Sequence, residues 1–303
     1  MKIAIIGGTG LIGIALSKEL KNRGDEILLI SRDSHSAKSK NKFAVKYFKW
    51  DYKTHQHLTV QINNYDAVIN LTGEPITGKR WNNSYMDELR NSRIEITKYV
   101  AEAICNCSEK PKVFISSSAT GFYGNVKNEI LNENSNSGND FLAKLCVDWE
   151  NASEKVATEN IRLVHIRTGV VLTKEGGALK KMLLPYRLFL GGPLGNGNQW
   201  FPWIHIQDEV GAIIFAIAND KIKGPINLTA PIPVKMKDFS KFLGKVLNRP
   251  SFFNVPKLAL RMVVGKVADV LVSSQRVLPQ KLLDSGYKFK FVEVEDALKD
   301  LLK

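Results

Sequence analysis

The sequence predicts an α/β protein in which a doubly wound parallel sheet is followed by a smaller C-terminal α+β lobe. Three observations support this prediction. Short apolar runs alternate with helix-length segments over residues 2–168, a pattern typical of parallel strands joined by right-handed helical crossovers. The runs are continuously apolar, as expected of strands that are covered on both faces. Beyond Thr168 the alternation stops, and segments rich in Gly, Pro and Trp appear.

Six strands are predicted in the first part of the chain, each an apolar run bounded by polar residues or glycine. They span residues 2–6, 26–30, 45–50, 66–71, 112–116 and 161–167. A helix is predicted over residues 11–22, because its apolar residues share one face at helical spacing. Longer helices are expected over 83–105 and 140–159, and the lysine-rich segment 38–49 is expected to be an exposed loop entering the third strand.

The second part of the chain is expected to form a lobe that packs closely on the first, since no low-complexity linker separates them. Its first segment, GGPLGNGNQWFPWIH at 191–205, is expected to be a loop or hairpin over a site. One strand is predicted over 224–231. The predicted helices span 208–218, 236–247, 257–268 and 294–302.

The composition is that of an ordinary globular protein, with 303 residues of which 44% are hydrophobic and 24% charged. The net charge of +13 favours an anionic ligand, such as a phosphorylated cofactor. It does not predict nucleic-acid binding, because the lysines are scattered and no arginine- and aromatic-rich recognition module is present.

Three sparse cysteines, Cys105, Cys107 and Cys146, show no metal-ligand spacing, which predicts no metal site and a reducing, cytoplasmic location. The N-terminal apolar run is too short for a signal peptide. No stretch reaches the roughly 18 apolar residues of a membrane helix. We therefore expect no association with a membrane.

A glycine pattern follows the first predicted strand. Gly7, Gly10 and Gly13 form G-x-x-G-x-x-G between a strand and a helix, which is the context of a dinucleotide-binding, Rossmann-type turn. Gly7 permits the tight turn, Gly10 lets the backbone approach a pyrophosphate, and Gly13 allows close packing of helix on strand. The helix N-terminus then faces the phosphates with free N–H groups.

Ser31-Arg32 stand at the end of the second strand, where an NAD-binding protein usually has an acid for the ribose 2′-hydroxyl. A guanidinium pairs with a 2′-phosphate, so Arg32 favours NADP over NAD. The alternative is an arginine on a solvated loop. Asp51, after the third strand, is placed either to accept a hydrogen bond from adenine or to cap a turn or helix, and both remain open.

Several longer motifs resemble one family. They are NLTGE at 70–74, SSSATGFYG at 116–124, RTGVVL at 167–172, FPWIHIQDEVGAI at 201–213 and SSQRVLPQKLLDSGYKF at 273–289. With the glycine pattern, they resemble the atypical extended short-chain dehydrogenase/reductases of the NAD(P)-dependent epimerase/dehydratase, or sugar-nucleotide epimerase-like, family. The likeness covers essentially the whole chain.

The resemblance implies a cofactor site residue by residue. The pyrophosphate is expected against Gly7, Thr9, Gly10, Leu11, Ile12 and Gly13. The rest of the cofactor is expected beside Ser31, Arg32, Asp51, Tyr52, Leu71, Gly73, Glu74 and Ser116. Arg80 is expected to close over it. Residues 1–168, joined by 203–228, then form the NADP-binding Rossmann domain, and residues 169–202 and 229–303 the substrate lobe.

The resemblance fails at the usual catalytic pair, a Tyr followed four positions later by a Lys. Glu150 resembles the glutamate that follows that Lys by four residues, which places Cys146 at the Lys position and Leu142 at the Tyr position. A leucine cannot exchange a proton with a substrate. Lys144 lies two helical positions from Cys146 and faces a different direction.

Three other residues are candidates for a replacement proton relay. Ser118 resembles the Ser/Thr that hydrogen-bonds substrate, although such a serine is often structural. Tyr123 is expected either on the substrate side or as a half-buried aromatic residue. Asp140 forms either an acid/base pair with Lys144 or, as we favour, a helix N-cap.

Two functions from different classes follow. We favour an NADP(H)-dependent oxidoreductase or epimerase-like enzyme that uses a non-standard proton relay on an unknown small-molecule substrate. The alternative is a non-catalytic NADP(H)-binding sensor or partner protein. Epimerisation of nucleotide sugars in the ordinary way is disfavoured, because that chemistry needs the Tyr as a base. The resemblance also implies a possible homodimer that pairs through the helices near 83–105 and 140–159.

Overall fold

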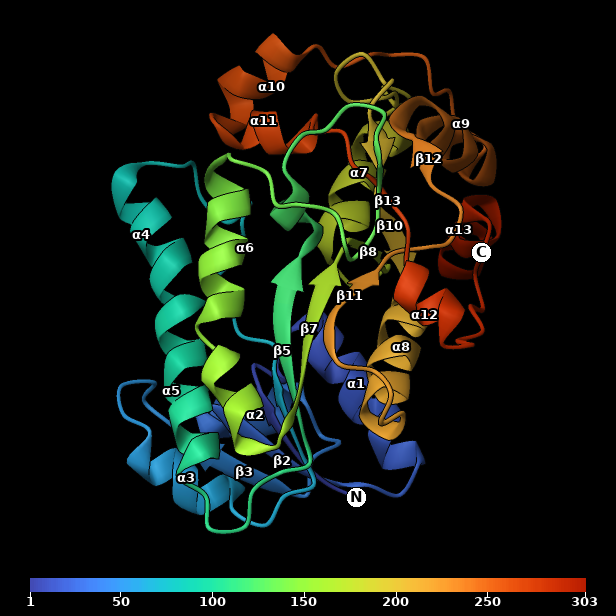
Figure 1. Ribbon diagram of the computed structural model, residues 1–303. Helices are drawn as coiled ribbons and strands as arrows, with labels where there is room; N and C mark the ends of the chain where they lie inside the picture. Colours follow the sequence, from blue (N-terminus) through green and yellow to red (C-terminus); the bar gives the residue numbers. More distant parts are fainter.

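A seven-stranded parallel sheet forms the centre of the computed structural model, which describes all residues 1–303 (Figure 1). The strands run in the order β11-β7-β5-β4-β1-β2-β3, and every neighbouring pair is parallel. Their bounds are β1 Lys2–Ile6, β2 Glu26–Ser31, β3 Lys46–Lys49, β4 Ala67–Asn70, β5 Val113–Ala119, β7 Arg162–Thr168 and β11 Gly224–Leu228. The predicted α/β class and doubly wound sheet are confirmed.

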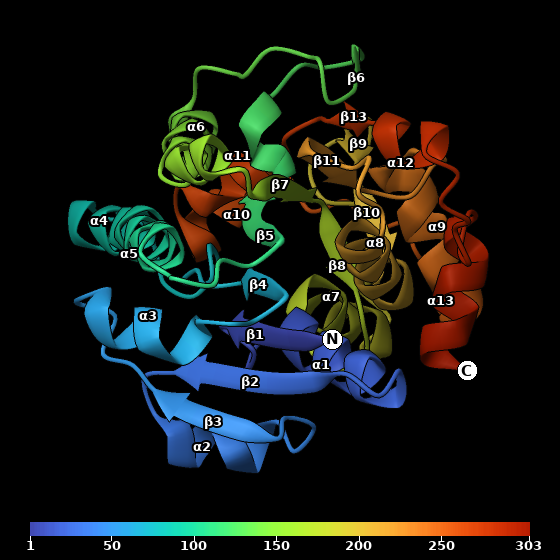
Figure 2. The ribbon, with the colours of Figure 1, turned by 60° about the horizontal axis from the view of Figure 1, so that its bottom comes forward.

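Helices cover both faces of this sheet (Figure 2). The helices α1 (Leu11–Asn22) and α8 (Ile206–Ala218) contribute to one apolar core with β1, β4, β5 and β7. The opposite face packs on α3 (Gln56–Ile62) and α5 (Ile94–Cys105), with α6 (Phe141–Asn151) beside them. Because β1 has β2 on one side and β4 on the other, the strand order reverses there, and a crevice for ligands opens at the carboxyl ends.

The C-terminal lobe lies beyond the carboxyl ends of β5 and β7, with its own core (Figure 1). Its short strand pairs are β8 (Val170–Leu172) with β10 (Trp203–His205), β9 (Trp200–Phe201) with β12 (Val234–Lys235), and β6 (Ile130–Leu131) with β13 (Arg276–Val277). Its helices are α7 Gly177–Arg187, α9 Met236–Leu247, α10 Lys257–Val264, α11 Val267–Leu271, α12 Gln280–Asp284 and α13 Val294–Leu302. None of the helices in the molecule is both long enough and apolar enough to cross a membrane.

Three predicted helices are interrupted in the structure. The helix expected over 83–105 is divided into α4 (Asn83–Asn91) and α5, with Ser92 and Arg93 at the break. The helix expected over 257–268 ends at Gly265, whose φ of +67° is left-handed. The helix expected over 140–159 continues after α6 only as a 3₁₀ segment, Glu154–Glu159.

Four helices were not predicted at all: α2 (Ser34–Lys40), α3, α7 and α12. The prediction of an exposed loop from residue 38 was wrong for its first residues, because α2 occupies them. The Asp33 side chain accepts hydrogen bonds from the N–H groups of His35 and Ser36, and this N-cap starts the helix.

Candidate functional site

The glycine turn between β1 and α1 forms one wall of the site. Gly7 has φ +80°, and a Cβ there would lie 2.8 Å from the Leu71 carbonyl carbon. A Cβ on Gly13 would lie 2.5 Å from the Gly8 Cα, so helix α1 approaches the turn closely only because this residue is glycine. Gly10 is the N-cap of α1 and supplies no side-chain cap. The first N–H groups of α1 therefore face a potential anion.

A buried asparagine that sequence reasoning missed holds this turn in place. The Asn41 side-chain amide donates to the Gly8 carbonyl at 2.8 Å and to Ser17 Oγ at 2.9 Å. Ser17 Oγ in turn donates to the Gly13 carbonyl at 2.7 Å. Both side chains are fully buried. The turn is therefore fixed by hydrogen bonds from α1 and from the segment after α2.

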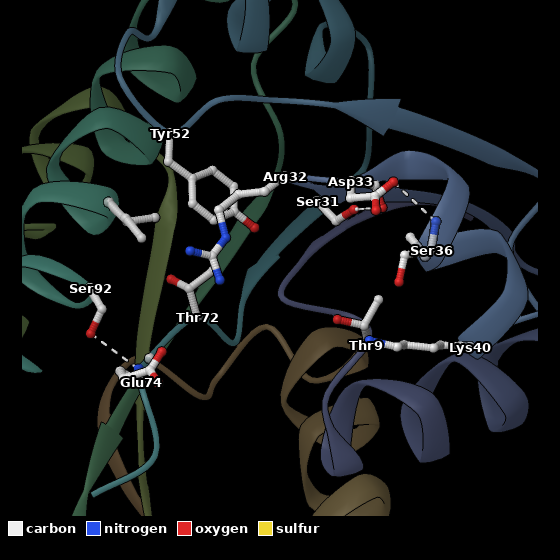
Figure 3. A pocket seen from close by; sticks show the side chains of 13 residues that line it. Thr9, Ser31, Arg32, Asp33, Ser36, Lys40, Tyr52, Thr72, Glu74 and Ser92 are labelled. Atoms are coloured by element: carbon white, nitrogen blue, oxygen red, sulfur yellow. Dashed lines mark hydrogen bonds between the residues drawn. The ribbon is translucent and has the colours of Figure 1, made fainter. Parts of the chain in front are cut away.

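A polar cavity of about 240 Å³ opens beside the turn, at the carboxyl ends of β2 and β4 (Figure 3). Its residues are Thr9, Ser31, Arg32, Asp33, Ser36, Ala37, Lys40, Tyr52, Thr72, Gly73, Glu74, Ser92 and Ile96. Six of them are predicted cofactor residues: Thr9, Ser31, Arg32, Tyr52, Gly73 and Glu74. The structure thus brings residues from four separate loops of the sequence to one cavity.

Two cations and two hydroxyl groups that line the cavity come from the end of β2 and from α2. Arg32 is exposed, and its guanidinium carbon lies 5.8 Å from the Tyr52 ring centroid. Lys40 and Ser36 come from α2, and Figure 3 shows them across the cavity from Tyr52. The Asp33 carboxylate also lines the cavity, but it is engaged in capping α2. The sequence analysis did not identify Lys40. Asp33 as an N-cap and lysines at the end of the following segment could have indicated a short helix there.

The remaining predicted cofactor residues do not line the cavity. Gly7, Gly10 and Gly13 shape the turn. Leu11 packs against Gly176, where an added Cβ would lie 2.9 Å from the Leu11 side chain. Ile12, Asp51, Leu71, Arg80 and Ser116 also lie outside the cavity. The Asp51 carboxylate accepts a hydrogen bond from the Lys53 N–H, which is the turn role that its alternative reading proposed.

Arg80 does not close over the cavity as expected. Its guanidinium donates to the Met262 carbonyl at 3.3 Å and lies close to Gly265. The side chain is exposed and connects the loop after β4 to α10 of the C-terminal lobe. The prediction failed because a chain position next to a cofactor loop does not determine which way a long side chain turns.

Ser118 belongs to a buried ion-pair network. Its hydroxyl donates to Glu150 Oε1 at 2.6 Å, and the Arg167 guanidinium holds both oxygens of Glu150 at 2.9 Å. All three residues are less than one-tenth exposed. A bidentate pair of this kind is short and strongly oriented. The hydroxyl of Ser118 therefore has a carboxylate in place to accept its proton.

Tyr123 corrects one of the predicted roles. The residue is fully buried, and its hydroxyl donates to Asn227 Oδ1 at 2.7 Å and accepts from Arg167 Nη1 at 3.1 Å. Burial raises the pKa of Tyr123 to about 12. It thus extends the Ser118–Glu150–Arg167 network into the interior, and its hydroxyl is engaged by Asn227 and Arg167.

The first turns of α6 contain neither the Tyr nor the Lys of the usual catalytic pair. Asp140 is the N-cap, since its carboxylate accepts the Ala143 N–H at 2.9 Å, as the favoured alternative held. Leu142 packs against Gly121. Cys146, at the position where the family has Lys, is buried, and burial raises the pKa of its thiol to about 12. Its thiol is therefore uncharged near neutral pH.

His205 and Asp208 do not form an acid/base pair. The His205 ring accepts the Gln207 N–H and so caps α8, and burial lowers its pKa to about 4. The Asp208 carboxylate accepts the N–H groups of Lys290 and Phe291 at 2.7 and 2.8 Å. Both residues tie the C-terminal segment to α8.

Comparison with known proteins identifies the family that this chain resembles. The model of the NAD dependent epimerase/dehydratase family matches residues 3–228, and that of a domain of unknown function, DUF1731, matches residues 255–301. The chain is 38% identical, over its whole length and 87% of the relative, to the chloroplastic epimerase family protein SDR39U1 homolog of Arabidopsis thaliana. It is 37% identical to an epimerase family protein of Staphylococcus aureus, with 98% of each chain covered.

Two solved structures share the fold. The human epimerase family protein SDR39U1, crystallised with NADPH, superposes with a TM-score of 0.90 at 34% identity, covering 99% of each chain. A UDP-glucuronic acid 4-epimerase of Bacillus cereus superposes with a TM-score of 0.78 over 99% of this chain and 98% of that one. Its identity is only 16%, so the second likeness concerns the fold alone.

Proposed function

The chain belongs to the NAD-dependent epimerase/dehydratase family, and on this premise we propose that it binds NADP(H) and acts as an oxidoreductase or epimerase-like enzyme. The observation that supports NADP is that two cations, Arg32 and Lys40, and two hydroxyl groups, of Ser31 and Ser36, line the cavity. Two cations and two hydroxyls fit a 2′-phosphate. The glycine turn, where a side chain would collide with backbone, fits the pyrophosphate. Three free cysteines are consistent with the proposed reducing, cytoplasmic location.

Replacement of Arg32 tests this proposal. We expect Arg32→Ala to weaken NADPH binding about 10- to 100-fold, because a charge-assisted hydrogen-bonded contact contributes roughly 1.5–3 kcal/mol. NADH, which lacks the 2′-phosphate, should bind weakly to both proteins and should not discriminate between them. Isothermal titration calorimetry with both cofactors measures this, and Arg23→Ala, at the opposite end of β2 beside Asp25, is the matched control. Equal affinity of the wild type for NADPH and NADH would contradict the assignment of NADP.

The proposed chemistry uses one part of the buried network. When bound, NADP(H) supplies or accepts the hydride. A substrate hydroxyl that loses its proton to Ser118 Oγ has an onward acceptor in Glu150, whose carboxylate already receives the Ser118 proton at 2.6 Å. Arg167 keeps that carboxylate oriented. This Ser118–Glu150 relay is the non-standard element that we propose in place of Tyr and Lys.

The second candidate, a non-catalytic NADP(H)-binding sensor or partner protein, is favoured by the structural engagement of Tyr123 and Asp140 and by the inert Cys146. Turnover separates the two candidates. The enzyme proposal expects carbonyl-dependent loss of reduced-nicotinamide absorbance, lowered about 100-fold or more in Ser118→Ala with NADPH affinity unchanged. A screen of small carbonyl compounds without any turnover, by a protein that binds NADPH tightly, would favour the sensor.

A further inference from the structure

One buried cation of the molecule has no acidic partner. Arg93, at the break between α4 and α5, is 7% exposed. Its guanidinium donates to the Glu74 carbonyl at 2.8 Å, to the Leu89 carbonyl at 3.1 Å and to Ser92 Oγ at 3.4 Å, all neutral acceptors. Arg167, which is equally buried, is neutralised by Glu150. No carboxylate lies within ion-pair distance of Arg93, and burial lowers the pKa of its guanidinium, with the Glu74 charge among those that oppose this shift. A buried cation without a paired anion is costly, so Arg93 is a candidate for binding a ligand.

The guanidinium of Arg93 borders the cofactor cavity. Its carbon would lie 3.3 Å from a Cβ on Gly73, and Gly73, Glu74 and Ser92 all line that cavity. Figure 3 shows Glu74 and Ser92 on the side opposite to Ser36 and Lys40. Arg93, which donates to the Glu74 carbonyl and to Ser92 Oγ, therefore lies on the side of the cavity opposite to Ser36 and Lys40.

Arg93 also lies near the position where the family has its lysine. The Arg93 charge acts on the Cys146 thiol, opposing the rise in the pKa of that group. The Cys146 sulfur would in turn lie 3.6 Å from a Cβ on Gly121, just after β5. The flat guanidinium lies over the Trp149 ring, 5.0 Å from its centroid, one turn along α6 from Cys146. Arg93, from the break between α4 and α5, thus lies near Cys146, the position on α6 where the family has a lysine and this chain has no cation.

We propose that Arg93 replaces the missing lysine as the cation that binds the ribose hydroxyls of the nicotinamide half of NADP(H). This rests on the proposed function, since it assumes that the cofactor occupies this cavity. A guanidinium has five N–H donors in a planar fork, and the neighbouring protein groups accept from only two of its nitrogens. The two adjacent hydroxyls of a ribose match such a fork. The bond to Glu74 and the contact with Trp149 hold the fork in one orientation.

The competing explanation is a structural strut, in which Arg93 only holds the loop after β4. Arg93→Gln separates the two, because it keeps an amide donor for the Glu74 carbonyl and removes the charge. Arg93→Lys restores the charge. Arg90→Gln, one turn earlier on α4 and paired with Asp148 at the surface, is the matched control. Thermal unfolding of each variant monitors the fold.

Calorimetry with two ligands tests the proposal. NADPH contains both halves of the cofactor, whereas adenosine 2′,5′-bisphosphate contains only the half that meets Arg32. We expect Arg93→Gln to weaken NADPH about 10- to 100-fold and to leave the bisphosphate within about twofold. Arg93→Lys should recover most of the NADPH affinity, and Arg90→Gln should match the wild type for both ligands.

Other results overturn the inference. Unchanged NADPH affinity in folded Arg93→Gln would show that the cation does not touch the cofactor. An equal loss for both ligands would show a structural strut, and so would lysine failing to restore NADPH binding. If Arg93→Gln does not fold, Arg93→Met takes its place, and it must weaken NADPH more than the bisphosphate to support the proposal. Failure of the wild type to bind either ligand would instead contradict the proposed function.

Discussion

At the scale of single residues, Glu209 is an unusual carboxyl group. It is fully buried on α8, where Oε1 accepts a hydrogen bond from Thr168 Oγ1 at 2.8 Å and Oε2 has no partner. Burial raises its pKa from 4.5 to about 8. The folded protein therefore holds a proton on Glu209 that the unfolded chain releases at neutral pH. No residue of the candidate site depends on this group.

This proton makes stability depend on pH with a defined sign. Below about pH 4.5 the carboxyl is neutral in both states, and its contribution to stability is complete. As the pH rises to about 8, only the unfolded chain ionises, so the contribution is lost at up to about 1.4 kcal/mol per pH unit. We expect Glu209→Gln, which stays neutral, to match the wild type near pH 5 and to exceed its free energy of unfolding near pH 8.

Urea unfolding at the two pH values measures this difference. Taking the difference between variant and wild type cancels other titrating groups, such as His165, whose pKa burial lowers to about 4. Parallel pH profiles for the two proteins would show that Glu209 ionises normally in the folded state.

At the scale of elements, two glycines of the turn between β1 and α1 differ in what a side chain at their position would contact. A Cβ on Gly13 would lie 2.5 Å from the Gly8 Cα, and backbone cannot move away cheaply. A Cβ on Gly10 would meet only the Gly7 carbonyl oxygen at 3.5 Å, and the Gly10 φ of −78° suits any residue. The two glycines thus serve different purposes within one motif.

We expect Gly13→Ala to lower the free energy of unfolding by about 1–3 kcal/mol or more through overpacking. Gly10→Ala should leave stability nearly unchanged but weaken NADPH binding at least about tenfold, because its methyl group would occupy the approach of the pyrophosphate. Chemical unfolding and calorimetry on both variants give the comparison. Normal NADPH affinity in Gly10→Ala would place the phosphates elsewhere.

At the scale of the whole molecule, pairing of two chains through α4, α5 and α6 remains a proposal from resemblance. None of the large exposed apolar side chains belongs to these helices. An interface there would lack the apolar centre of a typical obligate dimer and would depend on polar contacts. Exposed apolar residues instead occupy the end of α7 and the region of α10, including Leu188, Phe189, Leu258 and Met262.

The second part of the chain contributes a strand to the central sheet and side-chain hydrogen bonds to the first part. β11 follows α8 in the second part of the chain and pairs with β7 of the first part. Asn227 on β11 accepts the Tyr123 hydroxyl across 104 residues of sequence. The C-terminal segment is held through Asp208 on α8. This arrangement encloses the ion-pair network beneath the carboxyl ends of the central strands.

The sequence by itself determined the parallel strands, the glycine turn and the arginine after β2, because these depend on local periodicity and on residues at fixed offsets. It also placed Cys146 and Leu142 where a proton-transfer pair is absent. It did not predict α2, which the Asp33 side chain caps, or the break between α4 and α5 at Ser92 and Arg93.

Only the tertiary structure shows the surroundings of Ser118, Tyr123 and Arg93. Tyr123 is buried because Arg167, 44 residues away, and Asn227 converge on its hydroxyl. Arg93 lies beside the cavity because its guanidinium donates to the Glu74 carbonyl, after β4, and lies over the Trp149 ring of α6. Such contacts join residues far apart in the chain, and their distances are set by packing of the sheet and its helices rather than by any local pattern.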